Sequence, residues 1–291
     1  MFVIIGIVVV IMAVIGGFMF AGGNVVLLIQ PAEFVIIVGA AVGSMLISSP
    51  PNLLKKIVGS IPLLIKGFKI TKQDYLELLK AMNDLFLLAQ RDGLLAIEKH
   101  IENPQESEIL SQAKSFVSNH HVVTFFSDTM KVMLSGGVPP HELETLIDAE
   151  IETFEIEGKP VTATISKVGD AFPGLGIVAA VLGIIVTMSS IDKGPEYVGL
   201  HVAAALVGTF LGVLLSYGFV GPMATNLELI HESEKRYLET IKSCIVAYAK
   251  GNPPIVSVEF ARRTIFSDYR PSFSELENYI RGRGEAGSER K

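Results

Sequence analysis

The chain has 291 residues, of which 49% are hydrophobic and only 19% are Asp, Glu, Lys or Arg. Because a soluble protein carries about a quarter of its residues as charges, this composition, with a mean hydropathy of +0.48, argues against a soluble globular protein. The net charge of −6 says little about membrane topology, because acidic residues barely influence it.

Four long blocks contain no charged residue: 1–32, 34–54, 171–191 and 197–227. Each has at least 21 residues, and about 20 helical residues, at roughly 1.5 Å each, cross the ~30 Å hydrocarbon core of a bilayer. We therefore predict an all-α, polytopic membrane protein with four transmembrane helices. The first block lacks the basic start of a cleavable signal peptide, so we interpret it as a retained helix.

Lys and Arg residues concentrate on the cytoplasmic side of membrane proteins. Of the 24 in this chain, twelve lie in 51–168, eleven lie after position 222, and one, Lys193, lies in the turn between the third and fourth spans. The turn between the first two spans has none. Both termini and the long middle segment are therefore expected to be cytoplasmic.

The cytoplasmic parts are expected to be helical. Segment 71–93 has an apolar stripe of helical period, and Thr71 and Asp74 form a plausible capping box at its start. Further helices are expected over 94–102, 107–119 and 122–135, from Pro140 onward, and in continuation of the fourth span past Pro222.

The chain thus divides into four consecutive segments. Residues 1–50 hold the first two spans and a short periplasmic turn, and 51–168 form a cytoplasmic helical loop. Residues 169–222 hold the third and fourth spans, and 223–291 form a cytoplasmic helix and tail. The last dozen residues are small and charged and are expected to be disordered.

Signals for catalysis are weak. "HELET" at 141–145 begins like a zinc-protease motif but lacks the second His four residues after the first. The sequence has no phosphate-binding loop, dinucleotide fingerprint or nucleophile elbow. We therefore predict no enzyme activity, no catalytic or metal-binding residue and no cofactor. Cys244 is the single cysteine and is expected to be a buried thiol.

Small residues recur within the spans at helical spacing. In lipid, such residues let helix backbones approach one another closely. The sequence leaves open whether they join helices of one subunit or helices of different chains. They are Gly39 and Gly43 in the second span, Gly176, Ala179, Ala180 and Gly183 in the third, and Gly208 and Gly212 in the fourth.

No ionisable residue is expected inside the spans, because Glu33, Asp170, Asp192 and Glu196 all fall at span ends. Proteins that move ions usually hold such a group within the bilayer. If this chain conducts ions, another chain must therefore supply the carboxylate. The polar residues at depth can line a path but are poor proton carriers; they are Thr187, Thr209, Ser216 and Tyr217.

Three long stretches resemble the MotA family of flagellar motor stator subunits. They are "VGDAFPGLGIVAAVLG" at 168–183, "VGTFLGVLLSYGFVGPMA" at 207–224 and "PPIVSVEFARRTIFSDYRPSFSELE" at 253–277. The resemblance implies an inner-membrane homopentamer around two MotB chains, each of which carries a proton-binding Asp. Inward H⁺ flow would turn the flagellum through the rotor protein FliG. No nucleic acid is implied as a partner.

The resemblance also implies roles for individual residues. Pro173 and Pro222 stand where the family has two functional prolines, and a proline within a helix removes a backbone hydrogen bond and permits a hinge. Thr209 matches a pore-facing Thr. Ala180 stands where sodium-driven relatives tend to have Thr, so protons are the expected ion. Tyr217 completes the expected pathway residues.

The resemblance implies a rotor-facing site in the cytoplasmic loop as well. Glu98 matches an acidic residue of the family that faces the rotor. The partner Arg of the family would fall at Gln90, and Arg91 follows directly, so Arg91 is expected to substitute for it or the contact is rebalanced.

Two other functions compete with the stator interpretation. An energiser of the ExbB/TolQ type resembles this chain in its last two spans but usually has three spans, which the uncharged block 34–54 argues against. A multi-pass scaffold that conducts nothing is the other alternative.

Overall fold

The computed structural model describes residues 2–66 and 70–282. Within these ranges every regular element is a helix, which confirms the all-α prediction. The expected disorder of the last dozen residues lies, beyond Gly282, outside the described residues. The chain forms two compact units, one made of residues 1–67 and 157–230 and the other of residues 68–156 and 231–291.

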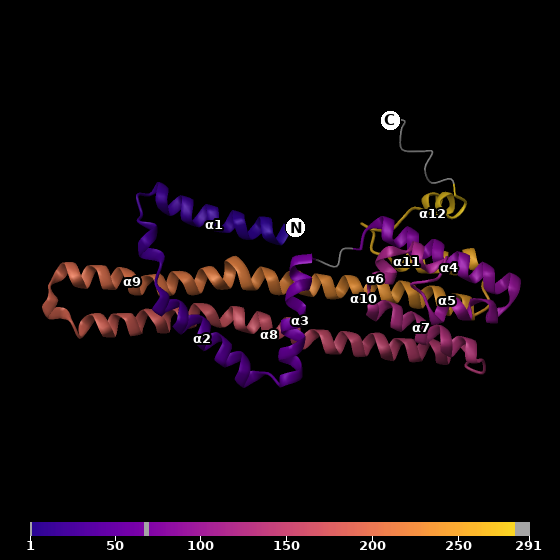
Figure 1. Ribbon diagram of the computed structural model, residues 1–291, viewed down its shortest axis with the longest axis horizontal. Helices are drawn as coiled ribbons and strands as arrows, with labels where there is room; N and C mark the ends of the chain where they lie inside the picture. The colour runs from indigo at the N-terminus through magenta and orange to yellow at the C-terminus, as the bar shows by residue number, and fades with distance from the viewer. Residues whose placement is uncertain (1, 67–69, 283–291) are drawn as a thin grey trace, which may run out of the picture. The chain divides into compact units, whose positions relative to one another are not determined.

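The first unit contains the membrane-spanning helices (Figure 1). Four helical stretches are long and apolar enough to cross a bilayer, which confirms the four predicted spans. Its elements are α1 (Phe2–Phe20), the 3₁₀ turn η1 (Val25–Leu28), α2 (Pro31–Ser48), α3 (Pro51–Lys66), the second part of α8 (Pro140–Met188), η4 (Ile191–Lys193), α9 (Pro195–Val213), η5 (Leu214–Val220) and the start of α10 (Gly221–Ala249).

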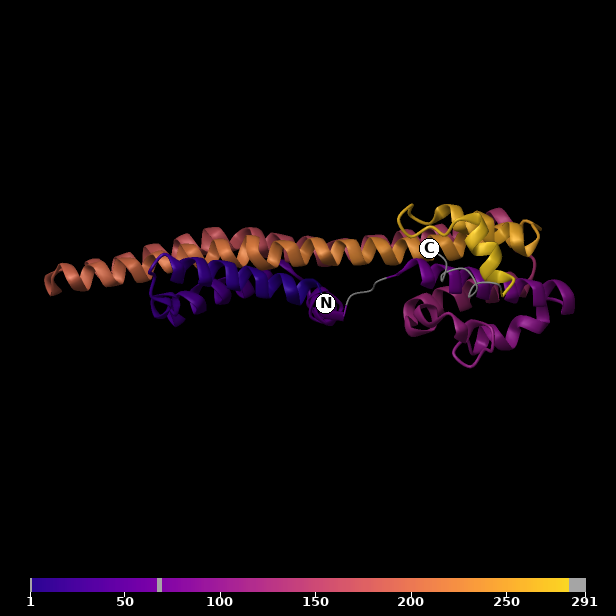
Figure 2. The ribbon, with the colours of Figure 1, turned by 90° about the horizontal axis from the view of Figure 1, so that it is seen from above.

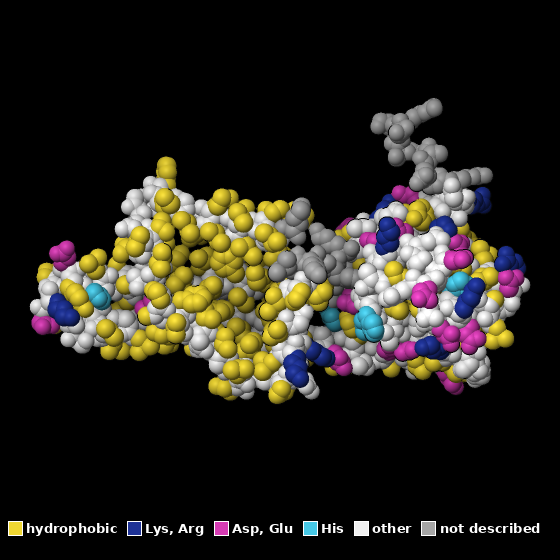
Figure 3. Space-filling model, in the orientation of Figure 1, with side chains coloured by type: hydrophobic (Ala, Val, Ile, Leu, Met, Phe, Trp, Pro, Cys, Tyr) yellow, Lys and Arg dark blue, Asp and Glu magenta, His cyan; other side chains and the backbone are white. Residues whose placement is uncertain are grey.

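Helices α8 and α9 form a long antiparallel hairpin, and α1 and α2 lie on one side of it (Figure 2). A small apolar core joins α2 to α8 through Ile37, Ala41, Phe172 and Ala179. Outside this core the unit exposes apolar side chains, as the yellow surface over α1, α2, α8 and α9 shows (Figure 3). Such a surface is stable in lipid but not in water.

Helix α3 is an element that the sequence analysis did not identify. It is amphipathic, and its residues Ile57 and Leu64 pack against Val161 of α8 and Leu227 of α10. Its opposite side carries charge, and the Lys56 ammonium lies 2.7 Å from a carboxylate oxygen of Glu157.

The second unit is a compact bundle of helices. The helix expected over 71–93 is confirmed, and its capping box is formed by Thr71 and Asp74. The unit contains α4 (Lys72–Asp92), η2 (Leu94–Ile97), α5 (Glu98–Glu102), η3 (Leu110–Gln112), α6 (Lys114–Ser118), α7 (His120–Ser135), the starting part of α8, most of α10, α11 (Pro254–Thr264) and α12 (Phe273–Ile280).

The single helix expected over 107–119 is wrong. This segment contains turns, η3 and the five-residue α6. The Ser107 hydroxyl accepts hydrogen bonds from the backbone N–H groups of Ile109 and Leu110. Such side-chain bonds compete with regular helix formation.

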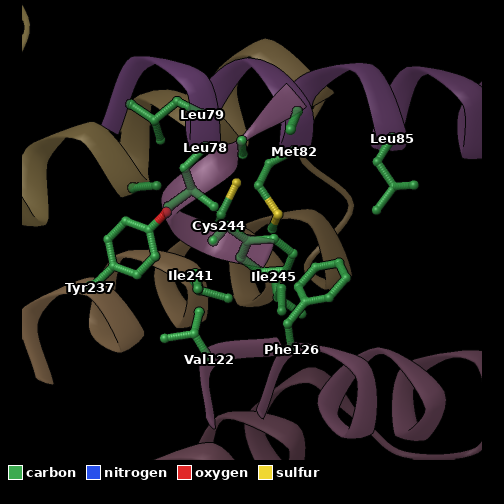
Figure 4. Close-up of a cluster of buried hydrophobic side chains, with 14 of the residues drawn as sticks. Leu78, Leu79, Met82, Leu85, Val122, Phe126, Tyr237, Ile241, Cys244 and Ile245 are labelled. Atoms are coloured by element: carbon green, nitrogen blue, oxygen red, sulfur yellow. The ribbon is translucent and has the colours of Figure 1, made fainter. Parts of the chain in front are cut away.

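The core of the second unit is built from large side chains (Figure 4). Tyr237 and Phe126 are fully buried. Cys244 is 1% exposed, which confirms the buried thiol, and burial raises the pKa of its thiol group. The residues labelled in Figure 4 come from three helices: Leu78, Leu79, Met82 and Leu85 from α4, Val122 and Phe126 from α7, and Tyr237, Ile241, Cys244 and Ile245 from α10.

Candidate functional site: the membrane hairpin and a surface of the second unit

The backbones of α8 and α9 touch because glycine occupies the contact points. A Cβ atom on Gly176 would lie 2.7 Å from the Gly208 carbonyl oxygen, and one on Gly212 would lie 2.5 Å from the Phe172 carbonyl oxygen. These separations are too short for any larger residue without movement of a backbone. The hairpin therefore packs main chain against main chain, as helices in lipid commonly do.

The small residues of the spans fall into two groups, those that join helices of this chain and those that contact nothing in its described ranges. Gly176, Gly208 and Gly212 pack within the chain, between α8 and α9. Gly39 and Gly43 of α2, in contrast, would meet no atom within 4 Å if they carried a Cβ. Among the described residues, no atom of the chain therefore packs closely against Gly39 and Gly43.

Pro222 lies two residues after the end of a rare π-helical segment, η5, where the fourth span is wound more widely. There the Gly221 N–H donates to the Ser216 carbonyl, five residues earlier, instead of to a carbonyl four residues earlier. Proline lacks an N–H group, and its ring collides with the carbonyl four residues before it. A wide turn relieves this collision, and π-segments of this kind occur often at functional sites.

Pro173 lies inside α8, which continues through it without a break. Its neighbour Phe172 contacts Gly212, and a Cβ on Gly169 would lie 3.6 Å from the Gly221 backbone nitrogen. These two contacts lie at either end of η5. Both prolines therefore belong to one short section of the hairpin, although they are 49 positions apart in the sequence.

The other three pathway residues have different surroundings. Ala180 is 6% exposed, and its backbone nitrogen would lie 3.2 Å from a Cβ on Gly208. Thr209 is half-buried, with its Cα close to Gly176. The Tyr217 side chain, within η5, is 72% exposed. The structure therefore brings Ala180 and Thr209 to the contact between α8 and α9, and leaves Tyr217 on the outside of the unit.

Glu33 differs from what its position in the sequence indicated. It is the third residue of α2, but its side chain is only 7% exposed and lies between α8 and α9. A Cβ on Gly183 would lie 3.1 Å from Glu33 Oε1, and one on Gly208 would lie 2.6 Å from Oε2. The expectation of a span interior without ionisable groups is therefore wrong. Sequence reasoning missed it because α2 begins beside Gly183 and Gly208, within the lengths of α8 and α9, and not beside the turn that joins these two helices.

The expected rotor-facing residues lie in the second unit, at the C-terminal end of α4 and the start of α5. Arg91 is in the last turn of α4, and Glu98 is the first residue of α5. Both are exposed, as is Gln90. Between them, the Leu95 side chain is 79% exposed. A single exposed apolar residue is common on protein surfaces, so Leu95 does not by itself mark a binding site.

The Arg91 guanidinium is held by its neighbour Asp92, with Nε donating to Oδ1 at 2.9 Å and Nη2 donating to Oδ2 at 2.7 Å. This hydrogen bonding raises the pKa of Arg91 and lowers the pKa of Asp92. Asp92 and Glu98 line the same hollow, of about 480 Å³. Arg91 and Asp92 are thus paired with each other, although the Arg91 side chain remains 75% exposed.

Nothing in residues 2–66 and 70–282 gathers three or more His, Cys, Asp or Glu side chains as a metal site would. The motif at 141–145 accordingly forms only the first turns of α8.

Known proteins resemble this chain along almost its whole length. The family description "Motility protein A N-terminal" matches residues 4–93, and "MotA/TolQ/ExbB proton channel family" matches residues 117–240. Motility protein A of Salmonella typhimurium is 37% identical over 97% of this chain and 95% of its own length. Motility protein A of Escherichia coli has the same identity and coverage.

A solved structure of C. jejuni MotAB has the same fold, with a TM-score of 0.77, 22% sequence identity and coverage of 93% of this chain and 98% of the other. The shared fold agrees with the four spans and the helical second unit. The chain is therefore a multi-pass membrane protein and not an enzyme, and it belongs to the motility protein A family, within the MotA/TolQ/ExbB proton channel family.

Proposed function

We propose that this chain is the ring subunit of a flagellar motor stator. In this proposal, five copies surround two MotB chains in the inner membrane, with both termini of each copy in the cytoplasm. Proton flow through the complex produces torque on the rotor protein FliG. The observation that carries the proposal is the 37% identity to motility protein A over 97% of the chain, which includes both the hairpin and the cytoplasmic unit.

The exposed surface of the first unit supports an assembly of several chains. Within Phe2–Phe20 no residue of α1 is buried. Gly39 and Gly43 present a bare backbone that a neighbouring helix can approach. A ring of copies around a partner helix would cover these faces, and the partner would add the proton-binding Asp.

The section that contains Pro173, Pro222 and η5 is suited to act as a hinge. A π-segment beside a proline has fewer regular hydrogen bonds than an α-helix, so it bends at lower cost. In the proposed mechanism, protonation of the partner's Asp changes the bend of this section. Thr209 and Ala180 lie one to two turns further along the same helix contact, and Ala180 favours protons over sodium.

The surface around Arg91 and Glu98 is proposed to meet the rotor. Because both side chains are exposed, each ion pair with a rotor would contribute modest energy and serve mainly to steer and align the partners. Charge reversal at Glu98 is therefore expected to weaken swimming without loss of the folded chain. Glu152→Lys, on an exposed position of α8, is the matched control.

The match of the N-terminal motility description to residues 4–93 favours a stator over an ExbB/TolQ-type energiser. This region holds the first two spans and α4, which the three-span energisers lack in this arrangement.

Reconstitution tests the proposal directly. The full chain is expressed with a single-span partner that has an Asp in its span and a peptidoglycan-binding domain, and proton uptake into vesicles is measured with a pH-sensitive dye. We expect flux with both chains and none when the partner's Asp becomes Asn. Flux from this chain alone, or no flux with any such partner, would contradict the proposal; the second result would favour a scaffold.

Swimming of cells that lack their own motility protein A tests the hinge. We expect Pro173→Ala to insert normally and to abolish swimming. Pro160→Ala is the control, because Pro160 also lies inside α8 but on an exposed position outside the hairpin contact. Normal swimming with Pro173→Ala would remove the hinge from the mechanism.

A further inference from the structure

The Glu33 carboxyl occupies a space that two glycines leave open. Gly183 of α8 and Gly208 of α9 lie on either side of it, and a Cβ on either residue would come within 3.1 Å of a carboxyl oxygen. Ala205 completes the same contact, because it would lie 2.8 Å from a Cβ on Gly183. A carboxyl group fits here only because both helices lack a side chain at this level.

Within the part of the chain that the structure describes, Glu33 Oε2 is fully buried and has no hydrogen-bond partner. The Thr187 hydroxyl, one turn from Gly183, donates to the Gly183 carbonyl at 2.8 Å and is therefore not free to donate to Glu33. Buried polar atoms without a partner are uncommon in native proteins, and a functional role or a bound water or ion is among the explanations for them.

The surroundings contain no positive charge to balance a carboxylate. The sequences of α1 and η1 hold no ionisable acid or base, and α2 has none after Glu33. Helix α8 has none between Asp170 and Asp192, and the nearest titratable group of α9 along the chain is His201, whose Nδ1 lies 2.9 Å from the Tyr197 carbonyl oxygen.

The position lies within the spanning helices. At about 1.5 Å per residue, Gly208 lies roughly 20 Å along α9 from its first residue, Pro195, and Gly183 lies roughly 7.5 Å before the last residue of α8, Met188. Nearby side chains that point outward, such as Ile185 and Leu206, are apolar and more than half exposed. An unpaired carboxylate at such a site costs several kcal/mol or more, whereas a neutral carboxylic acid avoids most of that cost.

We propose that Glu33 is a second proton-binding residue of the membrane unit, on this chain itself, in a cradle formed by Gly183 and Gly208. The carboxylate takes up one proton to become a neutral acid and gives the same proton up again, with no other bond changed. Proton binding by Glu33 stands independently of the proposed stator function; only its part in proton flow rests on that function.

Infrared spectroscopy of the full chain with its partner in lipid nanodiscs tests proton binding. We expect the difference spectrum between the wild type and Glu33→Gln to show the C=O band of a neutral carboxyl group at neutral pH. The band should shift in D₂O and disappear in alkaline buffer. A carboxylate band at neutral pH would overturn the proposal.

Proton flux tests whether the bound proton is transferable. Glutamine keeps the size of the side chain but cannot act as a carboxylic acid. We therefore expect Glu33→Gln to lower proton flux at least about tenfold, which corresponds to a rise of about 1.4 kcal/mol in the activation free energy. Glu33→Asp is expected to retain part of the flux. Unchanged flux in an assembled Glu33→Gln complex would overturn the proposal and leave Glu33 as a packing residue.

Two further variants separate the cradle from general effects on the helices. Gly208→Ala places a methyl group 2.6 Å from Oε2 and is expected to shift the infrared band. Gly199→Ala, also on α9 but with nothing within 4 Å, is expected to leave the band unchanged. If the wild-type complex passes no protons at all, the stator proposal fails, but the infrared result still decides the protonation of Glu33.

Discussion

The two units of the chain pack their helices with side chains of opposite size. The hairpin of α8 and α9 is held by glycines and alanines that bring backbones into contact, whereas α4, α7 and α10 are held by large aromatic and aliphatic side chains. In water, burial of large apolar groups stabilises a fold by about 25 cal/mol per Å². In lipid that gain disappears, because the surroundings are equally apolar. Close van der Waals contact and a few polar interactions then remain as the forces that hold helices together.

The two kinds of packing suit the two units to different functions. A core of interlocked large side chains resists deformation, and the second unit can therefore present Arg91 and Glu98 on a firm surface. A contact between two smooth backbones leaves room for the wide turns of η5 and for the Glu33 carboxyl. The less regular unit is the one in which the proposed ion chemistry takes place.

A large residue in the hairpin should have the largest effect. Gly212→Leu would place its Cβ 2.5 Å from the Phe172 carbonyl oxygen and 2.9 Å from the Gly176 Cα. Because main-chain atoms cannot move aside as side chains can, we expect assembled complex to fall by more than about tenfold, measured by affinity purification with the partner chain. Gly199→Leu, on the exposed side of α9, is the control. Normal assembly of Gly212→Leu would show that the hairpin contact is dispensable.

A cavity in the second unit should have the next largest effect. Phe126 is fully buried and packs edge-on against Phe116, with ring centroids 5.2 Å apart. We expect Phe126→Ala to lower the free energy of unfolding of this unit by about 3–5 kcal/mol, measured by hydrogen exchange of α7 amides in the full chain. The matched control is Phe260→Ala, because that ring is 53% exposed. Equal losses in both variants would argue against the core described above.

Of the three changes, a lower pH should have the smallest effect, on the stability of the helices around His100. His100 is buried, its Nδ1 lies 2.8 Å from the Ser107 hydroxyl, and burial lowers its pKa below the ordinary value of 6.5. Near these pKa values the folded state therefore binds fewer protons than the unfolded state. The contribution of neutral His100 to the stability of the folded state is complete above the ordinary pKa and is lost as the pH falls toward the lowered pKa of the folded state. We expect α5 amides to exchange faster, after correction for intrinsic rates, as the pH falls from about 7.5 to about 5.5, a range that includes the ordinary pKa.

His100→Gln should reduce this pH dependence. Burial also lowers the pKa of His231, so part of the dependence should remain in the variant. An identical dependence in the wild type and in His100→Gln would assign the effect to other groups.

The four membrane spans could be predicted from the sequence because their cause is local. A run of about 20 uncharged residues favours a spanning helix wherever it occurs, and the distribution of Lys and Arg sets an expected orientation. The cap at Thr71 and Asp74 is equally local, since its donors and acceptors lie three residues apart. The positions of Pro173 and Pro222 could also be read directly, although their roles still await the swimming test.

Local sequence features were therefore enough to predict most of the helices and the four spans. The three-dimensional structure was needed to show which small residues face one another, that the two prolines share one section of the hairpin, and that Glu33 lies inside the bundle. These features depend on how far α2 is displaced along α8 and α9. That displacement is set by contacts between residues more than 100 positions apart, such as Glu33 with Gly183 and Gly208, and no local pattern records it.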